Sequence, residues 1–238
     1  MSEIVTTERR EDCLIIRVNN PPVNALGHAV RAGIVDALQE TGDAKYAVLH
    51  CEGRTFFAGA DITEFGKSPL APSLADMIAA LEDCPIPVIA AIHGMALGGG
   101  LETALGCDDR IIDRKARIGF PEIDLGIFPG AGGTQRAPRL TGMAATLSMI
   151  LDGKHVDAAR AVDIGLCDEI SDGDLLENAI AFARQQTQNG FGERAFAAAR
   201  FAQHDDGFFV AQAEVDAIHR FDDAFAGAKV QGEIFQSK

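Results

Sequence analysis

Long hydrophobic runs are absent from this sequence. Apolar residues make up 47% of its 238 residues, yet no apolar stretch approaches the roughly 18 residues that a membrane-spanning helix needs. Residues 1–8 are polar and acidic, so we expect no signal peptide or transit sequence. The length and the apolar content are typical of a soluble globular protein with a substantial core.

Cysteine and histidine motifs are absent as well. The five cysteines include no Cys-x-x-Cys pair, and their odd number does not suit a disulfide framework. We therefore expect reduced cysteines that act as small hydrophobic residues in a cytoplasmic protein. The six histidines show neither His-x-x-x-His nor His-Glu-x-x-His spacing, so the sequence predicts no metal site.

Positive charge is scarce. The chain has 21 Lys and Arg against 35 Asp and Glu, for a net charge of −14. This balance argues against nucleic acid or an anionic membrane surface as a partner. A polyanionic ligand would have to meet Lys or Arg side chains placed near it, and the sequence does not indicate which.

Nucleotide-binding and serine hydrolase motifs are incomplete or missing. Residues 129–136 look like a phosphate loop but lack its Gly-Lys-Ser/Thr ending. Neither 98–103 nor 130–135 spells Gly-x-Gly-x-x-Gly, because Thr103 and Gln135 occupy the last place. There is no Gly-x-Ser-x-Gly, so a serine hydrolase is disfavoured.

Strands and helices alternate along the chain. Short apolar runs predict strands at 3–9, 14–18, 46–51, 88–93, 110–113, 116–119 and 166–170. Helical spacing of apolar residues predicts helices at 27–40, 73–83, 101–106, 134–140, 143–151, 157–165 and 174–188, with Ser73 as an N-cap. The first two strands are expected to form a hairpin, and the alternation predicts an α/β fold. Beyond residue 190, Ala- and Phe-rich segments predict two more helices, at 193–204 and 208–226.

The stretch from Gly94 to Glu102 has the features of a ligand site. It follows the predicted strand 88–93 directly, as a glycine turn, and it contains three successive glycines that leave the backbone unobstructed. A helix that begins here presents free N–H groups, which favour an anion or a developing oxyanion. Close packing of a helix on a strand would explain the glycines equally well, so the functional interpretation needs further motifs.

Two other segments supply these motifs. Residues 56–62 contain Ala58-Gly59-Ala60-Asp61-Ile62, and residues 120–136 contain Glu122, which lies 20 residues after Glu102. In their order and spacing, the three motifs resemble the enoyl-CoA hydratase/isomerase (crotonase) family, from about residue 12 to 190. The resemblance implies an α/β core of repeated β-β-α units in a spiral over residues 1–190. It also implies homotrimers, often paired into hexamers, and we assign oligomerisation to the helical segment 191–238.

The resemblance implies a catalytic site built from two backbone amides and two carboxylates. The N–H groups of Ala60 and Gly99 would bind the thioester oxygen while an enolate forms. Glu102 would activate water and Glu122 would transfer a proton at Cα, since two such carboxylates can share one proton near neutral pH. Isomerases that resemble this family often keep one glutamate, so the two glutamates here favour a hydratase.

The resemblance also implies the substrate-binding residues. Coenzyme A, as part of the substrate rather than a cofactor, would face Val23, Ala25, Ala58, Ala60 and Ile62. Asp61 lies in the same segment and is expected to bind loop N–H groups. The acyl pocket would be bordered by Gly98, Pro121 and Gly130, and the loops 63–76 and 120–133 would set the acyl chain length.

The resemblance leaves other activities open. Residues 22–26, Pro-Val-Asn-Ala-Leu, are similar to hydratase domains of multifunctional fatty-acid oxidation proteins, which favours hydration of 2-enoyl-CoA thioesters in β-oxidation. Isomerisation, or another acyl-CoA lyase or hydrolase reaction through the same enolate, is the alternative. A non-catalytic acyl-CoA-binding subunit is a third possibility, because the C-terminal segment departs from the family pattern.

Overall fold

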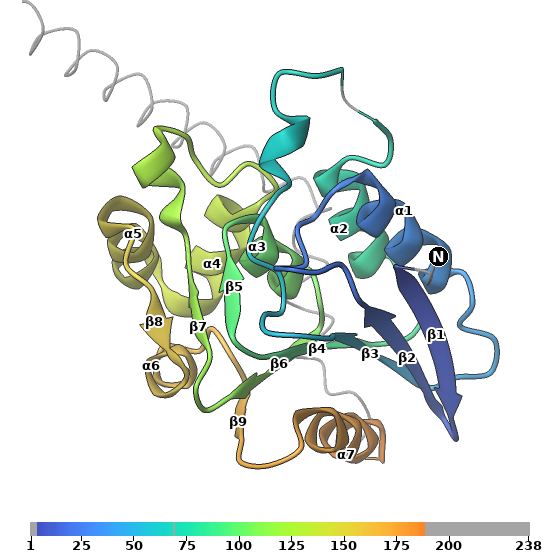
Figure 1. The fold of residues 1–238 in the computed structure, drawn as a ribbon. Helices are drawn as coiled ribbons and strands as arrows, with labels where there is room; N and C mark the ends of the chain where they lie inside the picture. The colour runs from blue at the N-terminus through green and yellow to red at the C-terminus, as the bar shows by residue number, and fades with distance from the viewer. Residues whose placement is uncertain (1–3, 69, 189–238) are drawn as a thin grey trace, which may run out of the picture. The chain divides into compact units, whose positions relative to one another are not determined.

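A six-stranded sheet lies at the centre of the computed structural model, which describes residues 4–68 and 70–188 (Figure 1). Its strands follow the order β1-β2-β3-β4-β6-β9. The first two pair antiparallel, as the predicted hairpin requires, and every other neighbouring pair is parallel. The strands are β1 (Val5–Arg10), β2 (Cys13–Val18), β3 (Tyr46–Cys51), β4 (Val88–Ile92), β6 (Asp109–Asp113) and β9 (Glu169–Ser171).

The sheet is buried on both faces, which explains the continuous apolar runs of its strands. In β2, Leu14 and Ile16 pack into the larger core, whereas Cys13 and Ile15 pack into a second cluster on the opposite face. Helix α7 (Leu175–Gln188) covers the second face, and three helices lie on the first (Figure 1). These are α1 (His28–Leu38), α2 (Leu74–Glu82) and α3 (Gly99–Leu105).

A smaller three-stranded sheet runs beside the first, in the order β5-β7-β8. It consists of β5 (Met95–Leu97), β7 (Arg117–Gly119) and β8 (Val156–Asp157). Each of its first two strands continues from a strand of the large sheet and leads to a helix, as β4-β5-α3 and β6-β7-α4. The remaining elements are α4 (Gly133–Thr141), α5 (Met143–Asp152), α6 (Ala158–Asp163) and the 3₁₀ helices η1 (Ile62–Glu64) and η2 (Pro121–Leu125).

The same unit occurs twice more in reduced form. Leu26 and Ala60 form an isolated parallel bridge, one after β2 and before α1, the other after β3 and before α2. The chain thus passes four times from the large sheet, through a short second strand or bridge, to a helix. This repetition confirms the β-β-α core that the resemblance implies.

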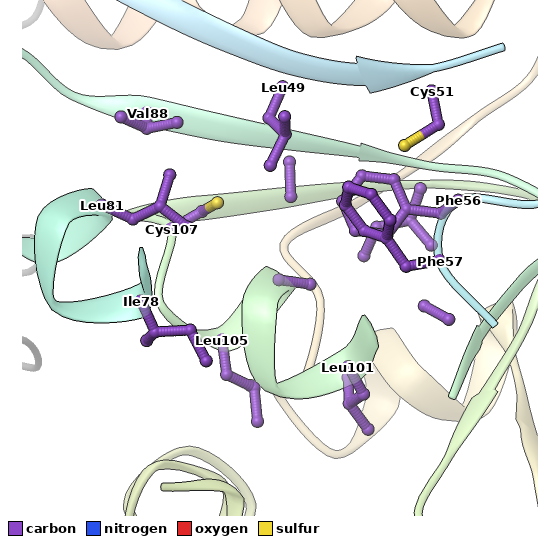
Figure 2. Close-up of a cluster of buried hydrophobic side chains, with 14 of the residues drawn as sticks. Leu49, Cys51, Phe56, Phe57, Ile78, Leu81, Val88, Leu101, Leu105 and Cys107 are labelled. Carbon is purple, nitrogen blue, oxygen red and sulfur yellow. The ribbon is translucent and has the colours of Figure 1, made fainter. Parts of the chain in front are cut away.

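Helix α3 is held against the large sheet by the core drawn in Figure 2. Leu101 and Leu105 come from α3, and Phe56 and Phe57 come from the loop after β3. Both phenylalanines are fully buried, and their rings meet edge to face with centroids 4.6 Å apart. Because the loop and the helix share this core, the amides at their ends are held in a fixed relation.

Two predicted boundaries are wrong. Residues 94–97 are not a glycine turn alone, because Met95–Leu97 forms β5 and pairs with β7. The last strand begins at Glu169 rather than residue 166. The amides of Leu166 and Cys167 both bond to the carbonyl of Ala161 and thus close the end of α6.

The other predicted elements are confirmed to within a few residues. Ser73 caps α2 as predicted, and Asp76 completes a capping box with it. Over the described residues, no helix has the length and apolar character to cross a membrane. The predicted helices 193–204 and 208–226, and the assignment of 191–238 to oligomerisation, lie outside the described residues.

Candidate active site

A cavity of about 430 Å³ opens where η1, α2, α3 and η2 approach one another. Nine of the residues predicted for the site line it: Ala58, Ala60, Ile62, Gly98, Gly99, Glu102, Pro121, Glu122 and Gly130. Val23, Ala25 and Asp61 do not. The carbonyl of Val23 accepts the amide of Ala58 at 3.2 Å, and the Asp61 carboxylate accepts the amide of Thr63 at 2.9 Å to cap η1. The expected bond from Asp61 to its own loop is confirmed.

Two of the three glycines before Glu102, Gly98 and Gly100, are explained by a close neighbour. Gly98 has φ of +51°, and a Cβ there would lie 2.8 Å from Glu122 Oε1. A Cβ at Gly100 would lie 2.1 Å from the carbonyl oxygen of Phe57, which is backbone and cannot move aside. Glycine is therefore required at Gly98 to admit the Glu122 carboxyl, and at Gly100 to let α3 approach the loop after β3.

Two backbone amides from separate segments, those of Gly99 and Ala60, lie at the cavity. Gly99 is the first residue of α3, so its N–H has no acceptor within the helix. The bridge between Leu26 and Ala60 leaves the Ala60 N–H unused, because the Leu26 amide donates to the carbonyl of Gly59 instead. A Cβ built on Gly99 would lie 3.6 Å from the Ala60 nitrogen. Neither N–H has an acceptor within residues 4–68 and 70–188, so both are available to a ligand oxygen.

Glu102 is held by the glycine-rich loop that precedes α4. Its Oε1 accepts the amides of Ala131 at 2.7 Å and Gly133 at 2.8 Å. Burial raises the pKa of the Glu102 carboxyl, whereas these two amides and the Arg136 charge lower it in opposition. Both of these bonds go to Oε1, and no donor among the described residues reaches Oε2, which is therefore available to a water molecule.

Glu122 lies on η2 across the cavity from Glu102. Pro121 occupies the first position of this 3₁₀ helix and fixes its start. The Glu122 side chain is buried, and its Oε2 has no partner within the described residues. Burial, with a further contribution from the Glu102 charge, raises the pKa of Glu122 to about 7. At neutral pH, Glu122 can therefore act as a proton donor or acceptor.

The rest of the cavity wall is apolar, and sequence motifs did not single it out. Loop residues Leu125 and Phe128 are 65% and 63% exposed, and they line the cavity together with Phe65, Leu74 and Ile127. They belong to the loops that were expected to border an acyl chain. Apart from Leu74, which lies on the predicted helix α2, their signal in the sequence is a set of large apolar residues in segments without helical or strand periodicity.

The described residues include no group of three or more His, Cys, Asp or Glu side chains that could hold a metal. The groups in the cavity that can take part in chemistry include two backbone amides and two carboxyls. Two N–H donors that reach the same oxygen stabilise an oxyanion, and the N–H groups of Ala60 and Gly99 are both at the cavity. Two carboxyls that line the same space, one with a pKa raised to about 7, can move protons to and from adjacent atoms.

Comparison with known proteins agrees with this geometry. Residues 8–231 match the family model for enoyl-CoA hydratase/isomerase. The chain is 46% identical over 172 residues to the peroxisomal bifunctional enzyme of Danio rerio, a match that covers 71% of this chain and 24% of that protein. It is 41% identical over 162 residues to a probable enoyl-CoA hydratase of Bacillus subtilis (strain 168), covering 64% of this chain and 63% of that protein.

A solved structure supports the same assignment. The crystal structure of an enoyl-CoA hydratase from Bacillus anthracis superposes with a TM-score of 0.75 and 31% identity, covering 91% of both chains. The fold is thus the crotonase fold that the sequence predicts. The chain spans about a quarter of the length of the bifunctional relative, and the match to the family model covers most of this chain. The protein belongs to the enoyl-CoA hydratase/isomerase family.

Proposed function

We propose that this protein is an enoyl-CoA hydratase, which adds water reversibly across the C2=C3 bond of 2-enoyl-CoA thioesters. The observation that carries the proposal is the pair of carboxyls, Glu102 and Glu122, which line one cavity with the free amides of Ala60 and Gly99. A family member that only moves a double bond needs a single carboxyl to carry the proton. Hydration needs one group for the water and one for Cα.

The amides act on the thioester oxygen. In the addition step, negative charge develops on this oxygen as the C2=C3 electrons shift toward the carbonyl. The N–H groups of Ala60 and Gly99 donate to it, and the loss of one such donor typically slows a reaction by about 10²–10³-fold. Because both donors are backbone groups of segments that pack on the same core, they need no rearrangement as the charge forms.

The carboxyls move the protons. Glu102 accepts a proton from water through Oε2 while the water oxygen bonds to C3, and Oε1 stays bonded to the loop amides. The resulting enolate takes a proton at C2 from Glu122, whose pKa of about 7 lets it hold that proton at neutral pH. One proton leaves water and one arrives at C2, so the pair ends with its starting total charge but with the proton on Glu102. Transfer of that proton from Glu102 to Glu122 restores the starting state.

The test is the loss of crotonyl-CoA absorbance with purified protein, with mass analysis of the product. The proposal predicts a product heavier by one water, and a loss of turnover in Glu102→Gln and Glu122→Gln. A product of unchanged mass with a moved double bond would favour isomerisation instead. Binding of the thioester without any turnover would favour a non-catalytic subunit.

The cofactor requirement, the oligomeric state and the location of the protein are also proposals. The acyl-CoA thioester is the substrate and no further cofactor is needed, because the amides and carboxyls supply all of the groups named above. The homotrimer or hexamer and the cytoplasmic location remain predictions from the sequence. Light scattering of the purified full-length chain measures the first, and fractionation of the source cells measures the second.

A further inference from the structure

A bidentate ion pair joins α2 to α4 next to the loop that holds the Glu102 carboxylate. The Nε and Nη2 atoms of Arg136 bond to the two carboxylate oxygens of Glu82, each at 2.7 Å. The side chains are 21% and 18% exposed, so water screens them less than a surface pair. The planar guanidinium matches the carboxylate with both bonds, which fixes the direction of the third nitrogen.

That third nitrogen reaches the loop that holds Glu102. Arg136 Nη1 donates to the carbonyl oxygen of Ala131 at 2.9 Å, and the amide of the same residue donates to Glu102 Oε1 at 2.7 Å. Ala131 therefore carries a continuous line of hydrogen bonds from Glu82, through Arg136, to Glu102. A shift of the guanidinium would move the amide that holds the carboxylate.

The backbone of the loop is shaped around this arginine. Gly132 has φ of +100°, and a Cβ there would lie 1.9 Å from Arg136 Nη1. At Gly133, a Cβ would lie 2.7 Å from the Phe120 ring and 3.1 Å from Glu102 Cγ. The two glycines thus let the loop pass between the guanidinium on one side and the Glu102 side chain on the other.

We propose that Arg136, anchored by Glu82, is a positioning residue for Glu102, and that it sets both the orientation and the protonation of that carboxylate. This inference rests on the proposed function for its kinetic consequences. Arg136 acts in two separable ways. Its hydrogen bond to Ala131 fixes the loop amides, and its positive charge favours the ionised form of Glu102, which is the form that accepts a proton from water.

The test uses Arg136→Met, Arg136→Lys, Glu82→Gln and the double variant Arg136→Met with Glu82→Gln. The control is Arg139→Met, which removes the same charge from an exposed site on the same helix. The first readout is hydration of crotonyl-CoA as a function of pH. The second is the titration of the Glu102 carboxyl carbon in ¹³C-glutamate-labelled protein, assigned by its loss in Glu102→Gln.

For Arg136→Met we expect kcat to fall by about 10- to 100-fold, as for a misplaced catalytic group, with KM changed by less than about 3-fold. The pKa of Glu102, and with it the acid limb of the pH profile, should rise, because the Arg136 charge that lowers it is removed. Arg136→Lys keeps the charge but cannot bond to Glu82 and Ala131 together. It should hold the pKa near that of the wild type while kcat falls.

Glu82 should act through Arg136 alone. Glu82→Gln is expected to lower kcat less than Arg136→Met does, and the double variant should be no slower than Arg136→Met. Additive losses in the double variant would overturn the proposed order of action. Values of kcat and of the Glu102 pKa in Arg136→Met that match those of Arg139→Met would overturn the inference itself.

The two proposals fail in different ways. If the wild type hydrates no enoyl thioester, the proposed function is wrong, but the carboxyl titration still decides whether Arg136 controls Glu102. If the wild type is active and both kcat and the Glu102 titration in Arg136→Met match those in Arg139→Met, the positioning role is wrong and the hydratase stands. If Arg136→Met does not fold, Arg136→Lys and Glu82→Gln carry both readouts.

Discussion

Replacing Glu122 with Gln should make the protein more stable at alkaline pH while abolishing turnover. Burial and the neighbouring Glu102 charge raise the pKa of Glu122 from 4.5 to about 7. The folded protein therefore holds this proton more tightly than the unfolded chain does. The wild type loses stability as the pH rises from about 4.5 through about 7, because folding must then bury a charge. Glutamine removes that charge and keeps the size of the side chain.

The magnitude follows from the shift in pKa. Each unit corresponds to about 1.4 kcal/mol, so Glu122→Gln should gain up to about 3 kcal/mol over the wild type at pH 8. For a domain of this size, that gain raises Tm by about 6–12 °C. The gain should shrink as the pH falls and vanish below about pH 4.5. Thermal melts from pH 4.5 to 8.5 measure it.

A matched control separates this effect from a general loss of negative charge. Asp36 is exposed on α1, so Asp36→Asn lowers the net negative charge equally without touching the cavity. Its effect on Tm should stay small across the pH range. A Tm difference between Glu122→Gln and the wild type that does not grow with pH would refute the reasoning, as would a gain in Asp36→Asn of the same size.

Further substitutions test the amides and the histidines. Gly99→Ala adds a Cβ 2.7 Å from Leu74 Cδ2, the end of a flexible side chain, and 3.6 Å from the Ala60 nitrogen, so we expect a folded protein whose crotonyl-CoA hydration falls by about 10²-fold. Gly100→Ala adds a Cβ 2.1 Å from the Phe57 carbonyl oxygen, so its melting temperature should fall sharply instead. Burial, with the nearby His93, lowers the pKa of His50 to about 4, and the wild type should therefore lose stability as the pH falls from about 6.5 toward 4. His50→Gln should remove up to about 3 kcal/mol of that acid sensitivity in denaturant titrations.

The elements that could be predicted from the sequence are those whose signal is local. The capping Ser73 and the apolar spacing after it predict α2, and the structure confirms both. Strand β5 was missed because three residues, Met95–Leu97, are too few to show a period and lie between glycines. The Leu26–Ala60 bridge is smaller still, and pairing between such distant residues leaves no mark on either segment alone.

In the candidate site, too, the residues in local motifs could be predicted and the contacts that depend on the fold could not. Glu102, Glu122, Ala60 and Gly99 were singled out by motifs, and they share one cavity. The support for Glu102 was missed, because it comes from backbone amides whose direction depends on the folded loop. The ion pair behind that loop joins Glu82 to a residue 54 positions later. No local spacing could predict it.

The most direct measurement of the central claim is a crystal structure with a slowly reacting 2-enoyl-CoA thioester bound. The account predicts that the thioester oxygen lies about 2.7–3.1 Å from both the Ala60 and the Gly99 nitrogens, with Glu102 near C3 and Glu122 near C2. An oxygen bonded to neither amide, or a C2=C3 bond beyond the reach of both carboxyls, would contradict it.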